Sequence, residues 1–387
     1  MVRNNKRKRR NWMAAFMGKA FIICLMLFIL GNILTPAKEK SEEENRMLNQ
    51  KPKLTWSSIL GGSYMKQYES YQADQFIGRN ALRRVKVAIN RLSGSREENG
   101  VFIGKKNQLM EDIAVPDDKT LVNNVKAIKS FAEKYPDISM SMILVPDSAN
   151  VLSSRLPSFA ETADQNLMIS QVKKNLGDSV SWIDAVQAMN KHRDEKIYYE
   201  TDHHWTTLGA FYTLQEAADT LGIKGDLSSR YASYPVSDSF NGTLAAKSGT
   251  RMNVKENIDI YVPKDTDNDV VVNYIDEQKK TTSLYDSSKL KGRDQYAVFL
   301  GGNTSVIDIK TMAEDQKKLL IVKDSFANSF VPFLTPYYRE IVMLDPRYFT
   351  GNITDIMETY HITDTMFLYS GNTFFEDNNL NGVLSNE

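Results

Sequence analysis

Two of the chain's four histidines stand side by side behind an aspartate, in the stretch Thr201-Asp202-His203-His204-Trp205. In an extended segment, residues i and i+2 point the same way, so Asp202 and His204 should share one face and His203 should look to the other. A carboxylate beside an imidazole is the orienting half of a nucleophilic triad. The stretch therefore predicts that His204 is a base oriented by Asp202. The nucleophile of such a triad must come from another part of the chain.

The best candidate for that nucleophile is Ser325, in Lys323-Asp324-Ser325-Phe326. It follows the apolar run 318–322, which has charged residues at both ends and is typical of a central parallel strand. A predicted helix begins directly after Ser325. Ligands bind at the carboxyl ends of such strands, and a helix N-terminus offers N–H donors to an oxyanion. Ser325 could equally be a capping serine, and Ser148, after another predicted strand, is a rival.

A metal site is the competing interpretation of the Asp-His-His cluster. One carboxylate and one correctly facing imidazole are too few ligands for it. His192 and His361 have no Cys, His or Asp-rich neighbours at a suitable spacing. We therefore expect neither a metal nor a cofactor. A third interpretation makes the cluster a set of polar caps packed under Trp205.

The elements that must position these residues alternate between strands and helices. Apolar runs typical of strands lie at 101–104, 138–145, 180–183, 297–300, 318–322, 340–345 and 365–369. Helical patterns lie at 117–134, 167–176, 185–191, 208–221, 326–338 and 355–360. Residues 223–295 interrupt this pattern and are interpreted as an irregular insertion, with substrate-contacting loops such as 240–243. The alternation predicts an α/β fold with a mainly parallel central sheet and helices on both faces, in three layers.

The N-terminal region predicts a membrane anchor. A block of basic residues precedes the apolar segment 12–34, which favours a single span with the N-terminus in the cytoplasm. A cleaved signal peptide is the alternative, because Thr35-Pro36-Ala37 is a weak cleavage-like site. We expect four parts: a cytoplasmic basic tail at 1–11, a transmembrane signal anchor at 12–34, a linker at 35–60 and an extracytoplasmic domain at 61–387.

The distribution of charge and the cysteine content exclude a nucleic-acid-binding surface and a disulfide from the predicted body of the protein. Residues 1–37 carry +7 and the whole chain is neutral, so the rest carries −7. The basic block is thus a local tail, and no nucleic-acid-binding surface is expected on the body. The single cysteine, Cys24, lies inside the predicted span, so the body should contain no disulfide.

Residues 64–92 are expected to form two helices. Aromatic and aliphatic residues recur there at helical spacing, and Gly78 interrupts the pattern. The tyrosine stripe of the first helix, Tyr64, Tyr68 and Tyr71, is interpreted as core contact.

The stretch Thr201–Thr206, with Gly209-Ala210 after it, resembles the signature of the DHHW protein family. Further stretches resembling that family lie between residues 42 and 375, such as Glu44-Asn45-Arg46 and Leu344-Asp345-Pro346-Arg347-Tyr348. The family is similar to the SGNH-hydrolase-like proteins of alginate O-acetylation. Compared with standard SGNH hydrolases, the two motifs stand in reversed order, and Lys323 occupies the place of a usual glycine.

The resemblance implies a membrane-anchored serine O-acetyltransferase with an SGNH-like domain, acting outside the cytoplasm on a cell-surface or exported polysaccharide. Asp202 would be the orienter, His204 the base and Ser325 the nucleophile. The acetyl donor would involve a membrane-bound O-acyltransferase partner. A carbohydrate acetyl esterase and a non-catalytic polysaccharide-binding or scaffold protein are the alternatives. Candidate oxyanion or substrate-binding groups are the Ser325 N–H, Gly302, Asn303, Asn241 and Arg347.

Overall fold

The computed structural model describes residues 2–264 and 269–385. The chain divides into two compact units, unit 1 (Met1–Gly94) and unit 2 (Ser95–Glu387). The expected domain at 61–387 thus includes the last part of unit 1 and all of unit 2. Residues 61–94 belong with the preceding segment because their side chains bind it: Asp74 Oδ2 accepts hydrogen bonds from Arg46 and Asn49.

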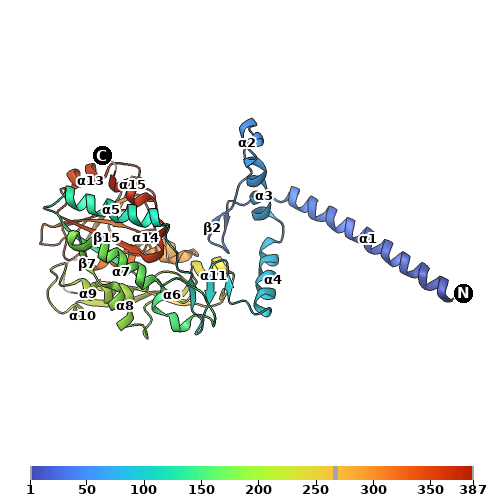
Figure 1. The fold of residues 1–387 in the computed structure, drawn as a ribbon, viewed down its shortest axis with the longest axis horizontal. Helices are drawn as coiled ribbons and strands as arrows, with labels where there is room; N and C mark the ends of the chain where they lie inside the picture. Colours follow the sequence, from blue (N-terminus) through green and yellow to red (C-terminus); the bar gives the residue numbers. More distant parts are fainter. Residues whose placement is uncertain (1, 265–268, 386–387) are drawn as a thin grey trace. The chain divides into compact units, whose positions relative to one another are not determined.

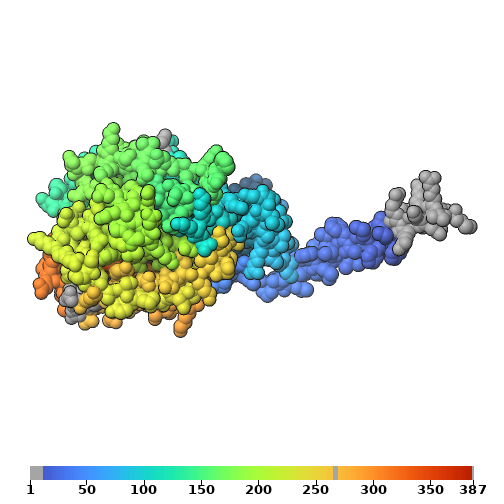
Figure 2. All heavy atoms as spheres, turned by 90° about the horizontal axis from the view of Figure 1, so that it is seen from below, coloured from blue at the N-terminus to red at the C-terminus, as the bar shows by residue number. Residues whose placement is uncertain are grey.

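The elements of unit 1 are α1 (Val2–Leu34), β1 (Lys40–Ser41), β2 (Arg46–Met47), α2 (Trp56–Leu60), α3 (Ser63–Gln75) and α4 (Arg79–Leu92). Within α1, Trp12–Leu34 is long and apolar enough to cross a membrane, and none of this span is buried (Figure 2). Gly78, at φ 75°, separates α3 from α4, as predicted. Among the tyrosines of α3, Tyr64 stacks on Tyr68, and Tyr71 makes a tilted ring contact with Tyr68. All three remain partly exposed, whereas the sequence predicted core contact.

Unit 2 is built on an eight-stranded sheet of order β11-β10-β12-β14-β13-β15-β6-β7. Its strands are β6 (Ser139–Val145), β7 (Ser181–Ile183), β10 (Val271–Tyr274), β11 (Lys279–Thr281), β12 (Val306–Lys310), β13 (Lys318–Lys323), β14 (Glu340–Leu344) and β15 (Asp364–Ser370). The five strands from β14 to β7 pair in parallel, whereas β12, β10 and β11 add an antiparallel edge. The predicted α/β fold with a mainly parallel sheet is confirmed.

The order of the parallel strands explains the reversed motifs. If β13, β14, β15, β6 and β7 are numbered one to five, their order across the sheet is 2-1-3-4-5. This is a common doubly wound order. The Asp-Ser dipeptide therefore follows the first strand and the Asp-His-His stretch follows the fifth, although the chain visits β6 and β7 before β13.

Helices cover both faces of the sheet because successive strand residues point to opposite sides. In β13, Leu319 and Ile321 join one core and Leu320 and Val322 the other. On the first side lie α8 (Ala185–Lys191), α9 (Thr207–Ala217) and α12 (Ala327–Phe330), and on the second α5 (Asp118–Lys134), α7 (Gln165–Leu176), α13 (Ile353–Tyr360) and α15 (Asn379–Ser385) (Figure 1). The predicted three layers are present.

Some predicted elements differ. The run 297–300 is not a strand, because Gln295–Val298 forms a short 3-10 helix. The run is apolar because its residues are buried. The helix expected at 326–338 ends early: α12 gives way to a 3-10 turn at Val331–Phe333, where Pro332 cannot supply a backbone N–H. Residues 223–295 are more regular than predicted. They contain the antiparallel pair β8 (Tyr231–Phe240) and β9 (Glu256–Pro263), α11 (Thr243–Ser248), and the edge strands β10 and β11.

Candidate active site

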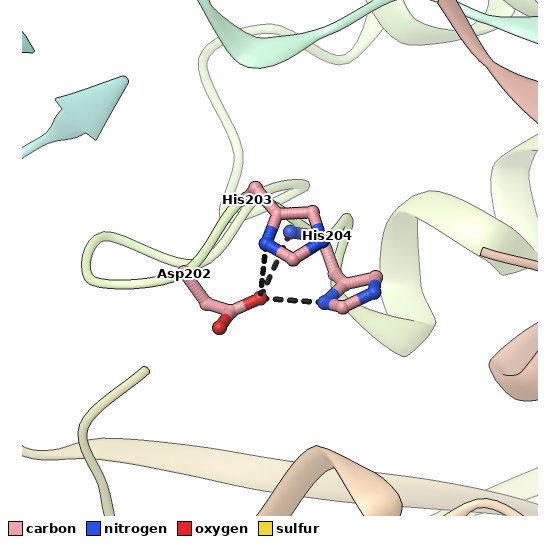
Figure 3. Close-up of side chains that lie close together, drawn as sticks. All are labelled: Asp202, His203 and His204. Atoms are coloured by element: carbon pink, nitrogen blue, oxygen red, sulfur yellow. Dashed lines mark hydrogen bonds and ion pairs between the residues drawn. The ribbon is translucent and has the colours of Figure 1, made fainter. Parts of the chain in front are cut away.

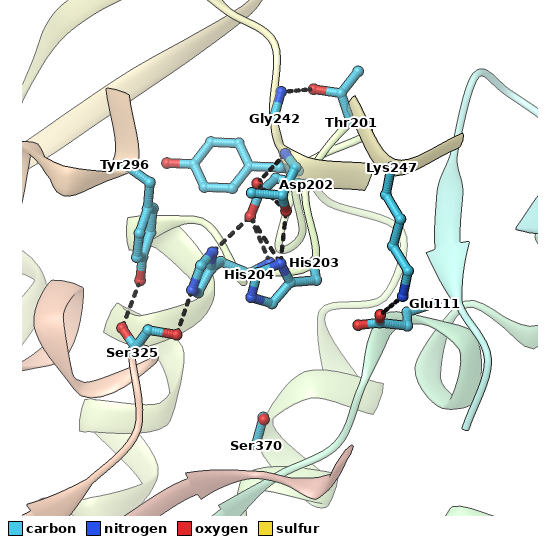
Figure 4. Close-up of polar contacts among 12 residues, drawn as sticks. Glu111, Thr201, Asp202, His203, His204, Gly242, Lys247, Tyr296, Ser325 and Ser370 are labelled. Carbon is cyan, nitrogen blue, oxygen red and sulfur yellow. Dashed lines mark hydrogen bonds and ion pairs between the residues drawn. The ribbon is translucent and has the colours of Figure 1, made fainter. Parts of the chain in front are cut away.

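The structure brings Asp202, His204 and Ser325 together. His204 Nε2 lies 2.7 Å from Ser325 Oγ, and His204 Nδ1 lies 2.6 Å from Asp202 Oδ1 (Figure 4). Ser325 is partly exposed, while the other two side chains are buried. When a hydroxyl, an imidazole and a carboxylate are hydrogen-bonded in this order, the imidazole can accept the hydroxyl proton. The carboxylate fixes the tautomer of the imidazole ring.

A tight loop presents the imidazole. Tyr198 and Trp205 form an antiparallel bridge, and Tyr199 N–H donates to the His204 carbonyl. The fully buried Trp205 donates from Nε1 to the Phe326 carbonyl at 3.1 Å. Trp205, directly after His204, is therefore hydrogen-bonded to Phe326, directly after Ser325. This bond fixes the distance between the two segments.

The Asp202 carboxylate is held by four donors. Its Oδ1 accepts from the backbone N and Nδ1 of His204, and its Oδ2 accepts from the N and Oγ1 of Thr243. A Cβ at Gly242 would collide with Asp202, so only glycine permits this approach. The segment 240–243, predicted as a substrate-contacting loop, thus holds the orienting carboxylate.

Burial and charge set the protonation of the pair. Burial alone would raise the pKa of Asp202, but His203, His204 and the Thr243 backbone hold it well below its usual range. Burial lowers the pKa of His204, and the neighbouring His203 lowers it further, against the opposing effect of Asp202. The carboxylate is therefore ionised and the imidazole neutral near pH 7, which is the state a general base needs.

His203 does not face away from Asp202, contrary to the sequence prediction. Its Nδ1 lies 3.6 Å from Asp202 Oδ1 (Figure 3). The ring centroids of His203 and His204 are 3.9 Å apart, and His203 Nδ1 also lies 2.8 Å from Thr243 Oγ1. The rule for extended segments fails because residues 201–204 form consecutive bends. His203 lies beside His204 and is partly exposed.

Tyr296 is a site residue that sequence reasoning missed. Its ring stacks on His204 with centroids 3.7 Å apart and an interplanar angle of 12°. Its hydroxyl lies 3.0 Å from Ser329 Oγ and 3.3 Å from the Ser325 carbonyl oxygen. Burial raises its pKa, which keeps the phenol neutral. No motif marks this residue, because its role comes from the fold of a loop distant in sequence.

Asp324 shapes the turn that carries Ser325. Its Oδ1 accepts from Phe326 N, and its Oδ2 accepts from the N and Oγ of Ser370, at the end of β15. Across residues 2–264 and 269–385, the Ser325 N–H makes no hydrogen bond. It is therefore available as an oxyanion donor beside the hydroxyl.

The other oxyanion candidates differ in availability. The amide of Asn241 donates to the Arg251 and Val254 carbonyls, so it holds a loop. The guanidinium of Arg347 pairs with Asp345 through two of its nitrogens. These contacts make both residues poor candidates for an oxyanion donor.

Gly302 and Asn303 lie beside the buried Lys323. Gly302 N–H donates to the Phe299 carbonyl, and the Asn303 Oδ1 accepts from Lys323 Nζ and Asn328 Nδ2, each at 3.0 Å. Among the described residues, the Asn303 Nδ2 donates to no other group, so its amide protons are available. Lys323, in the place of a usual glycine, thus fixes the orientation of Asn303.

Comparisons with known proteins agree with this architecture. A family model described as DHHW protein matches residues 120–344, more than half of the chain. The chain belongs to the DHHW protein family. No curated protein sequence matches it.

Two solved structures that resemble this chain share its fold. A DHHW family protein from Eubacterium siraeum is 24% identical, with a TM-score of 0.65 over 75% of this chain and 96% of that chain. Bacillus cereus PatB1 with a sulfonyl adduct is 21% identical, with a TM-score of 0.59 over 72% of this chain and 98% of that chain. The O-acetyltransferase domain of Pseudomonas putida AlgJ matches at 13% identity and a TM-score of 0.48, over 73% and 95% of the two chains.

Three of the four residues of the DHHW motif also place metal-ligand atoms near one another. One ligand atom each from Asp202, His203 and His204 lies within 4.8 Å of the others. These atoms already have partners, since His204 lies between Asp202 and Ser325, and His203 Nδ1 contacts Thr243. A metal ion would have to displace bonds that connect the base to the serine.

Proposed function

We propose that this DHHW protein is a membrane-anchored, extracytoplasmic serine O-acyltransferase that acetylates a cell-surface or exported polysaccharide through an acyl-Ser325 intermediate. The observation that carries the proposal is the unbroken hydrogen-bond series from Asp202 through His204 to the partly exposed Ser325 hydroxyl. The series lies at the carboxyl edge of a parallel sheet, where α/β folds bind ligands.

The chemistry proceeds in two balanced half-reactions. His204 Nε2 takes the proton from Ser325 Oγ as the oxygen attacks the donor's acetyl carbonyl, and the imidazolium returns this proton to the departing donor group. A sugar hydroxyl then gives its proton to His204 and attacks the acetyl carbon, and Ser325 leaves with that proton. Asp202 stabilises the imidazolium in both halves, and the Ser325 N–H and the Asn303 amide stabilise the oxyanion.

The acceptor and the location follow from the resemblance and from α1. The apolar span of α1 follows a basic segment, and by the positive-inside rule this supports a location of unit 2 outside the cytoplasm. Polysaccharides of the cell surface are the acceptors found there, and a membrane-bound O-acyltransferase would supply acetyl groups across the membrane. Removal of acetyl groups by water would use the same three residues, so the acceptor decides the reaction.

The test is acetyl partitioning by the full chain in nanodiscs, supplied with an activated acetyl ester and with or without an oligosaccharide acceptor. We expect an acetyl adduct on Ser325 whose decay accelerates with acceptor and yields acetylated sugar. Ser325→Ala should remove both signals, and the matched Ser148→Ala, after the end of β6, should preserve them. Release of acetate at an acceptor-independent rate would instead indicate an esterase, and the absence of an adduct would indicate a non-catalytic protein.

A further inference from the structure

We propose that α4 lies on the membrane that α1 crosses, with its apolar face at the boundary between lipid headgroups and acyl chains. This inference rests on the proposed membrane anchor. It adds a second lipid contact, made by a helix that does not span the membrane.

The apolar face of α4 consists of residues at helical spacing, Leu82, Val85, Ile89 and Leu92. Between 54% and 89% of each is exposed. In a soluble domain, such a stripe is the face that packs on the core. Here the buried apolar residue is Val87, on the other side of the helix, so the stripe is the uncovered face.

Ion pairs hold the polar side of α4 to the loop between β1 and β2. Arg79 pairs with Glu44 at 2.6 Å, Arg83 with Glu44 at 3.1 Å, and Arg84 with Glu43 at 3.1 Å. These contacts fix the rotation of α4 about its axis within unit 1. The apolar stripe is therefore displayed in a fixed direction.

The start of α4 is joined to the end of α1. Ile77 N–H donates to Asn32 Oδ1 at 2.9 Å, and the Phe76 ring stacks on Phe28 with centroids 6.0 Å apart. Ile77 also packs against Gly31, where an added Cβ would come within 3.2 Å of its Cδ1. The residues that lead into α4 thus contact the last turns of the membrane-spanning segment.

This contact sets the depth of α4. Phe28 precedes the end of the span at Leu34 by six residues, which is about 9 Å along a helix axis. Phe76, stacked on Phe28, therefore lies about 9 Å inside the outer end of the span. This is about the depth to which an interfacial helix buries its apolar face. Since α4 begins at Arg79, the helix starts in this layer.

Lipid fits α4 better than a protein partner does. The helix contains five basic residues and no acidic one. An apolar face with a basic polar side is typical of helices that lie in the membrane interface. The face is also continuous, through Phe76 and Ile77, with the surface of α1, whose exposed apolar side chains are suited to lipid.

The experiment places a fluorophore on single cysteines of the full chain in nanodiscs that contain lipid-borne quenchers. Cys24→Ser removes the native cysteine. Ile89→Cys then reports the apolar face, and Arg91→Cys, about 200° further around the same helix, is the matched control. Leu27→Cys reports whether α1 spans the bilayer.

We expect lipid quenchers to reduce emission at Ile89→Cys and Leu27→Cys, and aqueous iodide to reduce it at Arg91→Cys. If Leu27→Cys is quenched by lipid and Ile89→Cys behaves like Arg91→Cys, the anchor stands and the proposal for α4 is overturned. Shielding of Ile89→Cys from both quenchers would mean that protein covers the face, and it would also overturn the proposal. An unquenched Leu27→Cys would overturn the anchor and the proposal together.

Discussion

Two neighbouring regions of the sheet edge carry the same dipeptide with different surroundings. Asp324-Ser325 directly follows β13, and Asp147-Ser148 follows β6 after Pro146. Ser325 is partly exposed and bonded to His204, whereas Ser148 is 3% exposed at the start of a short helix. The dipeptide alone therefore does not make a nucleophile. We infer that the loop that delivers an imidazole decides which serine can act as a nucleophile.

The two aspartates are more alike than the two serines. Asp324 Oδ2 accepts from Ser370, and Asp147 Oδ2 accepts from Gln165 Nε2 and from Asn372 N. Both carboxylates thus tie a strand end to the segment that follows β15. Burial raises the pKa of Asp147 to about 7, which gives this aspartate a titration that can be tested.

Removing the imidazole of His204 should make Ser325 as unreactive as Ser148. His204→Gln is expected to lower kcat/KM for an activated acetyl ester by about 10⁴-fold or more, because no other group takes the Ser325 proton. Ser148→Ala should leave kcat/KM unchanged. Equal rates for wild type and His204→Gln in a stopped-flow ester assay would contradict this assignment.

Neutralising the orienter should have the next largest effect. Asp202→Asn is expected to reduce kcat/KM roughly 10³-fold, since an amide neither stabilises the imidazolium nor fixes its tautomer. Asp324→Asn retains an acceptor for the turn and serves as the comparison. Steady-state kinetics on both variants would refute the assignment of roles if Asp324→Asn were the more damaging.

The raised pKa of Asp147, after the end of β6, makes the stability of the protein depend on pH. With a folded pKa of about 7 against an ordinary value of 3.8, the folded state holds one more proton between these pH values, so stability falls as pH rises through that window. Asp147→Asn cannot ionise and should remove this slope, a difference on the order of 4 kcal/mol by pH 7.

Urea unfolding across this pH range measures the slope. The exposed Asp137→Asn is the control and should retain the wild-type dependence. A slope that persists in Asp147→Asn would show that another group carries the titration.

The pH dependence of activity gives the smallest of these effects. Because burial holds the pKa of His204 below its ordinary value of about 6.5, the acid limb of the kcat/KM profile should have its midpoint below that value. Activity should therefore rise with pH and reach its plateau before an exposed imidazole would be fully neutral. A midpoint above that value, in protein shown to be folded by circular dichroism, would argue against a buried neutral base.

Much of the fold was predictable because buried parallel strands leave continuous apolar runs, as in Leu320–Val322. Asp202, His204 and Ser325 were identifiable because each has a residue type suited to one step of the chemistry. The contacts of Thr243 and Tyr296 were not predictable, since only the tertiary path of residues 223–299 brings them to the base. His203 was misplaced because a bend, not an extended strand, carries the motif.

The most direct test is to map where a sulfonyl fluoride attaches to the full-length protein, using peptide mass spectrometry. A sulfonyl adduct is present in the structure of Bacillus cereus PatB1, which shares this fold. We expect one adduct on Ser325, absent in Ser325→Ala and slow to form in His204→Gln, with Ser148 unmodified. An adduct on Ser148, or one that forms equally fast without His204, would contradict the proposed assignment of base and nucleophile.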